Sequence, residues 1–209
     1  KISYSDIPGM ELLVGGGFYF AETNTKQILF AGVVDTDSLQ DRITPVRVAR
    51  LCGINRLLMI GTAVSFRESE SAFVIVRDHI NLLGDNPLIG PNADRFGTRF
   101  PDMTDVYPAD FAGKIRDELR FLTGKEIIDG VLVAVDDIAD MSPSERQAIG
   151  EVGQCYLTSE LVPESIGAKH TGMEIGAVLV SSDEKDRDIS SDDAECLHQL
   201  LVRGAGKFF

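Results

Sequence analysis

The sequence contains no tryptophan and only three cysteines among 209 residues. Cys52, Cys155 and Cys196 are odd in number, widely spaced and set among apolar residues. This pattern argues against a disulfide framework and for reduced thiols in a protein core. We therefore expect a reducing compartment, that is, a cytoplasmic protein.

Basic residues are scarce. The chain has 20 Lys and Arg against 33 Asp and Glu, which gives a formal net charge of −13. Such a charge repels a nucleic-acid backbone and an anionic membrane surface. Nucleic acid and membrane are therefore not expected partners.

Long apolar runs are missing too. No stretch reaches the ~18 apolar residues that a membrane helix needs. The start, KISYSDIPG, lacks the basic-then-apolar layout of a signal peptide. We expect a soluble chain without internal repeats or low-complexity tracts.

The remaining sequence alternates between strand-like and helical segments, and its length and 44% hydrophobic content fit one domain over 1–209. The predicted strands are β-rich apolar runs, at Gln27–Val34, Arg56–Ile60, Ala72–Val76, Gly130–Val135 and Ile175–Val180. The predicted helices have apolar residues at steps of three and four, at Pro45–Leu51, Val106–Leu122, Ser142–Val152 and Ser191–Val202. Strands that are apolar on both faces are typical of a central, largely parallel sheet, so we predict a layered α/β fold.

One helix start can be read in detail. Ser142 is a cap, Pro143 occupies the first helical position, and Glu145 is placed to bond back to the cap. The sequence therefore predicts a capping box at this position.

Residues Asn81–Met103 contain repeated prolines and glycines without a sustained period, which predicts a long ordered loop with a functional or interfacial role. With its flanks the segment reads RDHINLLGDNPLIGPNADRFGTRFPDMTDVY over residues 77–107. It closely resembles the trimeric purine nucleoside phosphorylases, which read Arg-Asp-His-Ile-Asn, Asn-Pro-Leu-x-Gly-Pro-Asn and Arg-Phe-Gly-x-Arg-Phe-Pro. TPVRVARLCGI at 44–54 and VPESIGAKHTGMEIGAVLV at 162–180 extend the resemblance.

The resemblance implies a twisted mixed β-sheet flanked by helices and a trimer with sites near the subunit boundary. The family domain begins upstream of Lys1, so we expect its N-terminal part to be absent. The family is a group of pentosyltransferases that break the bond between purine and ribose with phosphate as the nucleophile. No cofactor is implied beyond phosphate as co-substrate.

Four positions implied to bind phosphate carry other residues in this chain. The family's Gly-Arg-Phe-His stretch falls on 32–35, so that Val33 replaces the cation and Asp35 the imidazole. Its Asn-Ala-Ala-Gly-Gly turn falls on 61–65, where Thr62 lies, and its phosphate-binding serine falls on Glu160. Carboxylates at these places would repel phosphate.

The purine and ribose positions are partly kept. The base-binding glutamate falls on Met141, next to Asp140. The family's Thr-Asn pair falls on Ser182 and Asp183, of which Asp183 could accept a bond from a purine amino group. Further candidate substrate contacts are His198, near the family's ribose-binding histidine, Phe100, which matches an aromatic that reaches into a neighbouring site, and Tyr156.

Several of these residues also have a structural interpretation that involves no substrate. Asp183 begins a charged stretch typical of a solvated turn, and His198 lies among leucines as a packing residue would. Phe100 also fits a trimer contact. The acidic residues Asp136, Asp137 and Asp140 lack calcium-loop spacing, so no metal is predicted.

Three functions follow as hypotheses. The first is a non-catalytic family member, structural or partner-regulating, that assembles as a homotrimer or with related subunits through the 81–104 loop, or within a larger complex. The second is an active purine nucleoside phosphorylase, so whether the chain is an enzyme stays open. The third is a protein that binds a nucleoside without turning it over, through Phe100, Tyr156, Ser182 and Asp183.

Overall fold

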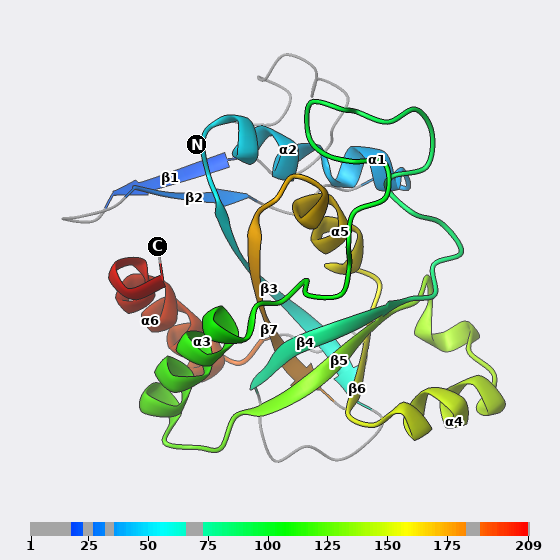
Figure 1. Ribbon diagram of the computed structural model, residues 1–209. Helices are drawn as coiled ribbons and strands as arrows, with labels where there is room; N and C mark the ends of the chain where they lie inside the picture. Colours follow the sequence, from blue (N-terminus) through cyan, green and yellow to red (C-terminus); the bar gives the residue numbers. More distant parts are fainter. Residues whose placement is uncertain (1–17, 23–26, 32–35, 66–72, 183–188, 209) are drawn as a thin grey trace.

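The core of the protein is a closed five-stranded barrel in the order β3-β6-β5-β4-β7 (Figure 1). The computed structural model describes residues 18–22, 27–31, 36–65, 73–182 and 189–208. The barrel strands are β3 (Arg56–Ser65), β4 (Phe73–Asn81), β5 (Ile128–Ala134), β6 (Cys155–Thr158) and β7 (Glu174–Ser182). The β3/β7, β4/β5 and β5/β6 pairs are parallel, whereas β4/β7 and β3/β6 are antiparallel.

Burial on both faces explains the apolar runs within the barrel strands. All four residues of β6 and the first four of β4 are buried. One side of each strand faces the barrel interior, and the other is covered by helices. The continuous apolar runs in the sequence reflect this two-sided packing.

The helices surround the barrel in three groups (Figure 1). α3 (Ala109–Thr123) and α6 (Ser191–Phe208) pack side by side over one side, and α4 (Pro143–Val152) covers β5 and β6. α1 (Leu39–Arg42), α2 (Thr44–Leu51) and α5 (Val162–His170) lie together near one end, where the 81–104 loop passes over them. A separate hairpin is formed by β1 (Phe18–Glu22) and β2 (Gln27–Ala31).

The structure confirms the α/β architecture of a mixed sheet flanked by helices. It also confirms the capping box, since Ser142 accepts from the Glu145 amide and Glu145 accepts from the Ser142 amide. No helix or strand occurs between Asn81 and Ala109, as the predicted loop requires. Within the described residues, no helix has the length and apolar character needed to cross a membrane.

Several details differ from the sequence prediction. Antiparallel pairs close the barrel, so its strands are less uniformly parallel than predicted. β1, β6 and α1 were not predicted because each has only four or five residues, too few to show a period. Cys52 is exposed just after α2, which corrects its assignment to the core, while Cys155 is buried and Cys196 is partly buried.

Gly130 provides a stability test of the barrel interior. A Cβ at this position would lie 2.5 Å from Cε2 of Tyr156 and 2.8 Å from Cγ1 of Val74. We expect Gly130→Ala to lower the free energy of unfolding by about 1–3 kcal/mol, as overpacking does. Gly150→Ala is the control, because a Cβ there meets no atom within 4 Å. Urea denaturation measures the free energy of unfolding of both variants, and equal losses in the two would contradict this packing. In a Tyr156→Leu background the loss caused by Gly130→Ala should be smaller; an unchanged loss would also contradict it.

Candidate functional site

Two segments about 100 residues apart meet at the start of α5. Gly61 of β3 lies directly beneath Leu161, and a Cβ on Gly61 would lie 2.8 Å from Cδ1 of Leu161. We call the turn Thr158–Leu161, the first turn of α5 and the facing part of β3, residues 61–65, the α5 entrance. The structure thus brings together two of the segments that were implied to bind phosphate.

Leu161 has an unusual backbone at this entrance. Its φ is 69°, and it is the one non-glycine residue with a positive φ in the described parts of the chain. The left-handed conformation is unfavourable for a branched side chain, so the surrounding contacts must hold it. The Leu161 carbonyl oxygen accepts hydrogen bonds from the Ser165 amide at 2.9 Å and from the Ser165 hydroxyl at 2.7 Å.

Acidic side chains dominate the electrostatics of the entrance. The first turn of a helix carries free N–H groups and a partial positive charge, which favour an anion. Glu164 already lies in this turn, and Glu160 is half-buried just before it. Burial raises the pKa of Glu164, and the nearby Arg42 opposes that rise.

Arg42 of α1 is the cation that reaches this entrance in the described structure. Its Nε donates to Oε1 of Glu164 at 3.0 Å, and its Nη1 donates to the Ser159 carbonyl at 3.0 Å. The two side chains are only 12% and 18% exposed. Arg42 therefore joins α1 to the turn before α5 and neutralises one of its carboxylates.

An open pocket of about 490 Å³ lies where β5 ends. Its wall is partly apolar and partly acidic, with the residues Leu82, Val135, Asp136, Asp137, Asp140, Met141, Glu145, Ala148 and Ile149. Two of the carboxylates have structural roles: Asp137 accepts from the Ala139 amide, and Glu145 from the Ser142 amide. The pocket contains Met141, at the base-binding position that the resemblance implies, and its neighbour Asp140.

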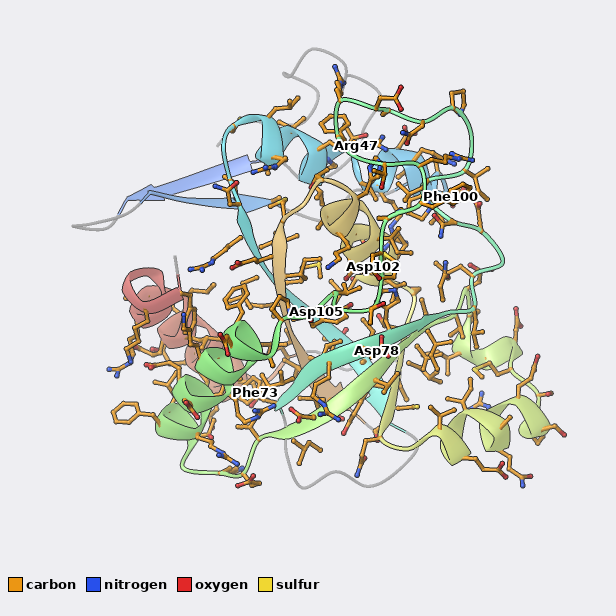
Figure 2. All side chains as sticks on the ribbon, in the orientation of Figure 1. Arg47, Phe73, Asp78, Phe100, Asp102 and Asp105 are labelled. Atoms are coloured by element: carbon orange, nitrogen blue, oxygen red, sulfur yellow. The ribbon has the colours of Figure 1, made fainter. Side chains whose placement is uncertain are left out.

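The 81–104 loop is fastened to the helices beneath it (Figure 2). Arg99 donates to the carbonyls of Leu88 and Gly90, which closes the loop on itself. The guanidinium of Arg47 on α2 lies 5.3 Å from the centre of the Phe96 ring. Gly97 lies against the His170 carbonyl at the end of α5.

Of the four predicted phosphate positions, two can be compared with this geometry. Thr62 is exposed on β3, next to the Gly61–Leu161 contact, and Glu160 belongs to the entrance. Val33 and Asp35 lie outside the described residues.

The predicted nucleoside contacts are scattered. Phe100 is 85% exposed on the loop, whereas Tyr156 is fully buried inside the barrel. His198 is exposed on α6, in a different helix group from the entrance and from the pocket (Figure 1). Ser182 ends β7 and pairs with Val64 of β3, and Asp183 lies outside the described residues.

Sequence reasoning missed Arg42, Glu164 and Ser165; Glu164 and Ser165 are consecutive in α5, and Arg42 reaches Glu164 only because α1 docks on α5. No group of three or more His, Cys, Asp or Glu side chains is arranged to hold a metal in the described part of the chain.

Comparisons with known proteins agree with this architecture. The family model of the phosphorylase superfamily matches residues 3–204, so the chain belongs to that superfamily. Purine nucleoside phosphorylase 1 of Geobacillus stearothermophilus is 37% identical over 186 residues, which cover 84% of this chain and 67% of that protein. The Bos taurus purine nucleoside phosphorylase is 33% identical over 166 residues, covering 77% and 57%.

Solved structures give the same result. The Schistosoma purine nucleoside phosphorylase in complex with guanosine superposes with a TM-score of 0.83 at 26% identity, over 97% of this chain and 82% of that one. The chain belongs to the purine nucleoside phosphorylase family. It spans between 57% and 67% of the length of the two curated relatives named above.

His170, which is buried, and His79, which is partly buried, predict how stability depends on pH. Burial lowers the pKa of His79, and burial together with Arg47 lowers that of His170. Below about pH 6.5, the ordinary histidine pKa, the unfolded chain therefore binds more protons than the native one. We expect the free energy of unfolding to fall between pH 7 and pH 5, with a slope of up to about 1.4 kcal/mol per pH unit for each such proton.

Urea denaturation at several pH values measures this slope. His170→Gln should reduce it, because it removes the lowered pKa of His170. An unchanged slope in His170→Gln would contradict the assignment.

Proposed function

We propose that the protein cleaves purine nucleosides by phosphorolysis, giving a free base and ribose 1-phosphate. The observation that carries this proposal is the retained family architecture, with 37% identity to a purine nucleoside phosphorylase and the assembled α5 entrance. Fold alone does not determine activity. The residues at the entrance and the pocket therefore decide how the reaction would proceed.

Phosphate would bind at the α5 entrance, where N–H groups and the helix dipole favour an anion. Glu160 and Glu164 oppose it, and Arg42 offsets only part of their charge. We therefore infer a low affinity for phosphate. Turnover would need a high phosphate concentration.

The purine would lie near the pocket at the end of β5, where apolar side chains can pack against a flat ring. Charge that develops on the leaving purine requires a hydrogen-bonding group placed for the transition state. We propose Asp140, in the pocket wall, and Asp183, which follows Ser182 at the end of β7, as acceptors for purine N–H groups.

A second candidate is a non-catalytic family member with a structural or regulatory role. The observation that favours it is the acidic entrance, where the Leu161 side chain covers Gly61 and carboxylates stand where phosphate would bind. Under this alternative the same fold would serve assembly rather than turnover.

Both candidates use the 81–104 loop as a subunit contact. Phe100, Ile89 and Leu82 are 85%, 57% and 50% exposed on it. Exposed aromatic and aliphatic side chains on an ordered loop are favoured at protein interfaces. We propose that this surface joins copies of the chain, or this chain and related subunits.

The test is release of purine from inosine and from adenosine, each with and without phosphate. Phosphate-dependent release supports phosphorolysis. Inosine binding in equilibrium dialysis without any release would instead support a nucleoside-binding protein. Neither binding nor release by a folded, assembled protein would support the structural role.

A further inference from the structure

A buried chain of hydrogen bonds links the base of the 81–104 loop to the α5 entrance. The Tyr107 hydroxyl donates to Oγ of Ser165 at 2.9 Å, and the Ser165 hydroxyl donates to the Leu161 carbonyl at 2.7 Å. Nδ1 of His79 lies 3.2 Å from the Tyr107 hydroxyl. Each hydroxyl has a single proton, and Tyr107 and Ser165 have already donated theirs. His79 must therefore donate from Nδ1 to the Tyr107 oxygen if all three hydrogen bonds form together.

These side chains are placed to act together. Ser165 is fully buried and Tyr107 is 5% exposed, so water does not compete for their bonds. Burial raises the pKa of Tyr107, which keeps its hydroxyl protonated as a donor. Bonds in such a network polarise one another and carry a high cost when one member is lost.

The row of hydrogen bonds ends at Leu161, whose backbone conformation is unfavourable. Leu161 holds a left-handed backbone, and its carbonyl accepts both Ser165 donors. The side chain of the same residue, Leu161, lies over Gly61, so the hydrogen bond to its carbonyl and the contact with β3 depend on one backbone conformation. Losing the hydroxyl bond would therefore act on the shape of the α5 entrance.

At its other end, the row of hydrogen bonds holds the 81–104 loop. His79 lies just before the 81–104 loop and Tyr107 just after it, so the two flanks of the loop meet at the Tyr107 hydroxyl, which in turn donates to Ser165. Two further contacts reinforce this attachment: Lys169 donates to the Asp105 carbonyl, and Gly97 lies against the His170 carbonyl. α5 thus contacts the loop through His170 and the residues just after the loop through Ser165 and Lys169, while its first turn belongs to the entrance.

We propose that Ser165 is a positioning residue that couples the 81–104 loop to the left-handed turn at Leu161. When Tyr107 and His79 are in place, Ser165 holds the Leu161 carbonyl and the entrance keeps its shape. When the loop moves away, Ser165 loses its donor from Tyr107 and the turn loosens. This coupling does not depend on which function the entrance serves.

Hydrogen exchange followed by mass spectrometry tests the coupling in the full chain. Ser165→Ala and Tyr107→Phe each remove one hydroxyl from this row of hydrogen bonds. Thr171→Val is the matched control, since Thr171 is also buried and donates to a carbonyl of α5, that of Ala168 at 2.8 Å, without reaching the loop. Peptides that cover 82–105 and 157–164 report the two ends separately.

We expect both test variants to speed exchange in both peptides by about tenfold, and the double variant to do no more than the stronger single variant. Thr171→Val should change neither peptide relative to the rest of the protein. Faster exchange at 157–164 with an unchanged loop, or fully additive effects, would overturn the proposal. Tyr107→Phe preserves the buried ring, so it decides the question if Ser165→Ala does not fold.

Discussion

Glu160→Ser is expected to lower the phosphate concentration for half-maximal purine release by about tenfold. Glu160 precedes the first turn of α5, the proposed phosphate position, and carries a charge of the same sign as phosphate. Two unit charges about 6 Å apart interact by about 1–3 kcal/mol when the effective dielectric constant lies between those of water and a protein surface. Removing one carboxylate therefore changes phosphate affinity by roughly 5-fold to 100-fold.

The measurement is purine release as a function of phosphate, together with calorimetric titration by inorganic phosphate alone. Glu151→Ser makes the same change in net charge at an exposed position on α4 and serves as the control. An equal effect of the two variants would show that only the overall charge matters. No effect of Glu160→Ser in either assay would mean that phosphate does not bind at the α5 entrance.

Gly97→Ala is expected to detach the 81–104 loop from α5. A Cβ at this position would overlap the carbonyl oxygen of His170 and lie 3.1 Å from its ring atom Cδ2. A backbone oxygen within a helix cannot move aside as a flexible side chain can. We expect a loss of about 1–3 kcal/mol in the free energy of unfolding and a Tm lower by about 2–4 °C for each kcal/mol.

Gly113→Ala is the control, because a Cβ at Gly113 of α3 meets no atom within 4 Å and alanine is the better helix former. Its Tm should stay equal or rise. Limited proteolysis should cut Gly97→Ala, but not Gly113→Ala, within 82–105. A loop that stays protected in Gly97→Ala would contradict the close approach to His170.

The fold could be predicted from the sequence where segments were long and periodic. α3 and α4 were found because their apolar spacing and the Ser142 cap are local signals. β6 has only the four residues CYLT, all buried, and no local pattern distinguishes it from other apolar runs. Closure of the barrel depends on the antiparallel β3/β6 pair, which no local signal reports.

The candidate site was predicted less completely. The resemblance marked 61–65 and Glu160 separately, but only the structure shows that Leu161 lies over Gly61. Arg42 and Ser165 carry no motif of their own, and their roles arise from the docking of α1 and Tyr107 on α5. The positive φ of Leu161 had no sequence signal, because leucine rarely adopts it.

We propose that this family member cleaves purine nucleosides with weakened phosphate binding. The most direct measurement is the initial rate of hypoxanthine release from inosine by the assembled protein, over a wide range of phosphate concentrations. We expect release that depends on phosphate and that saturates only at concentrations above those needed by the Geobacillus stearothermophilus relative. No release at any phosphate concentration from the folded protein would contradict it and would favour the non-catalytic role.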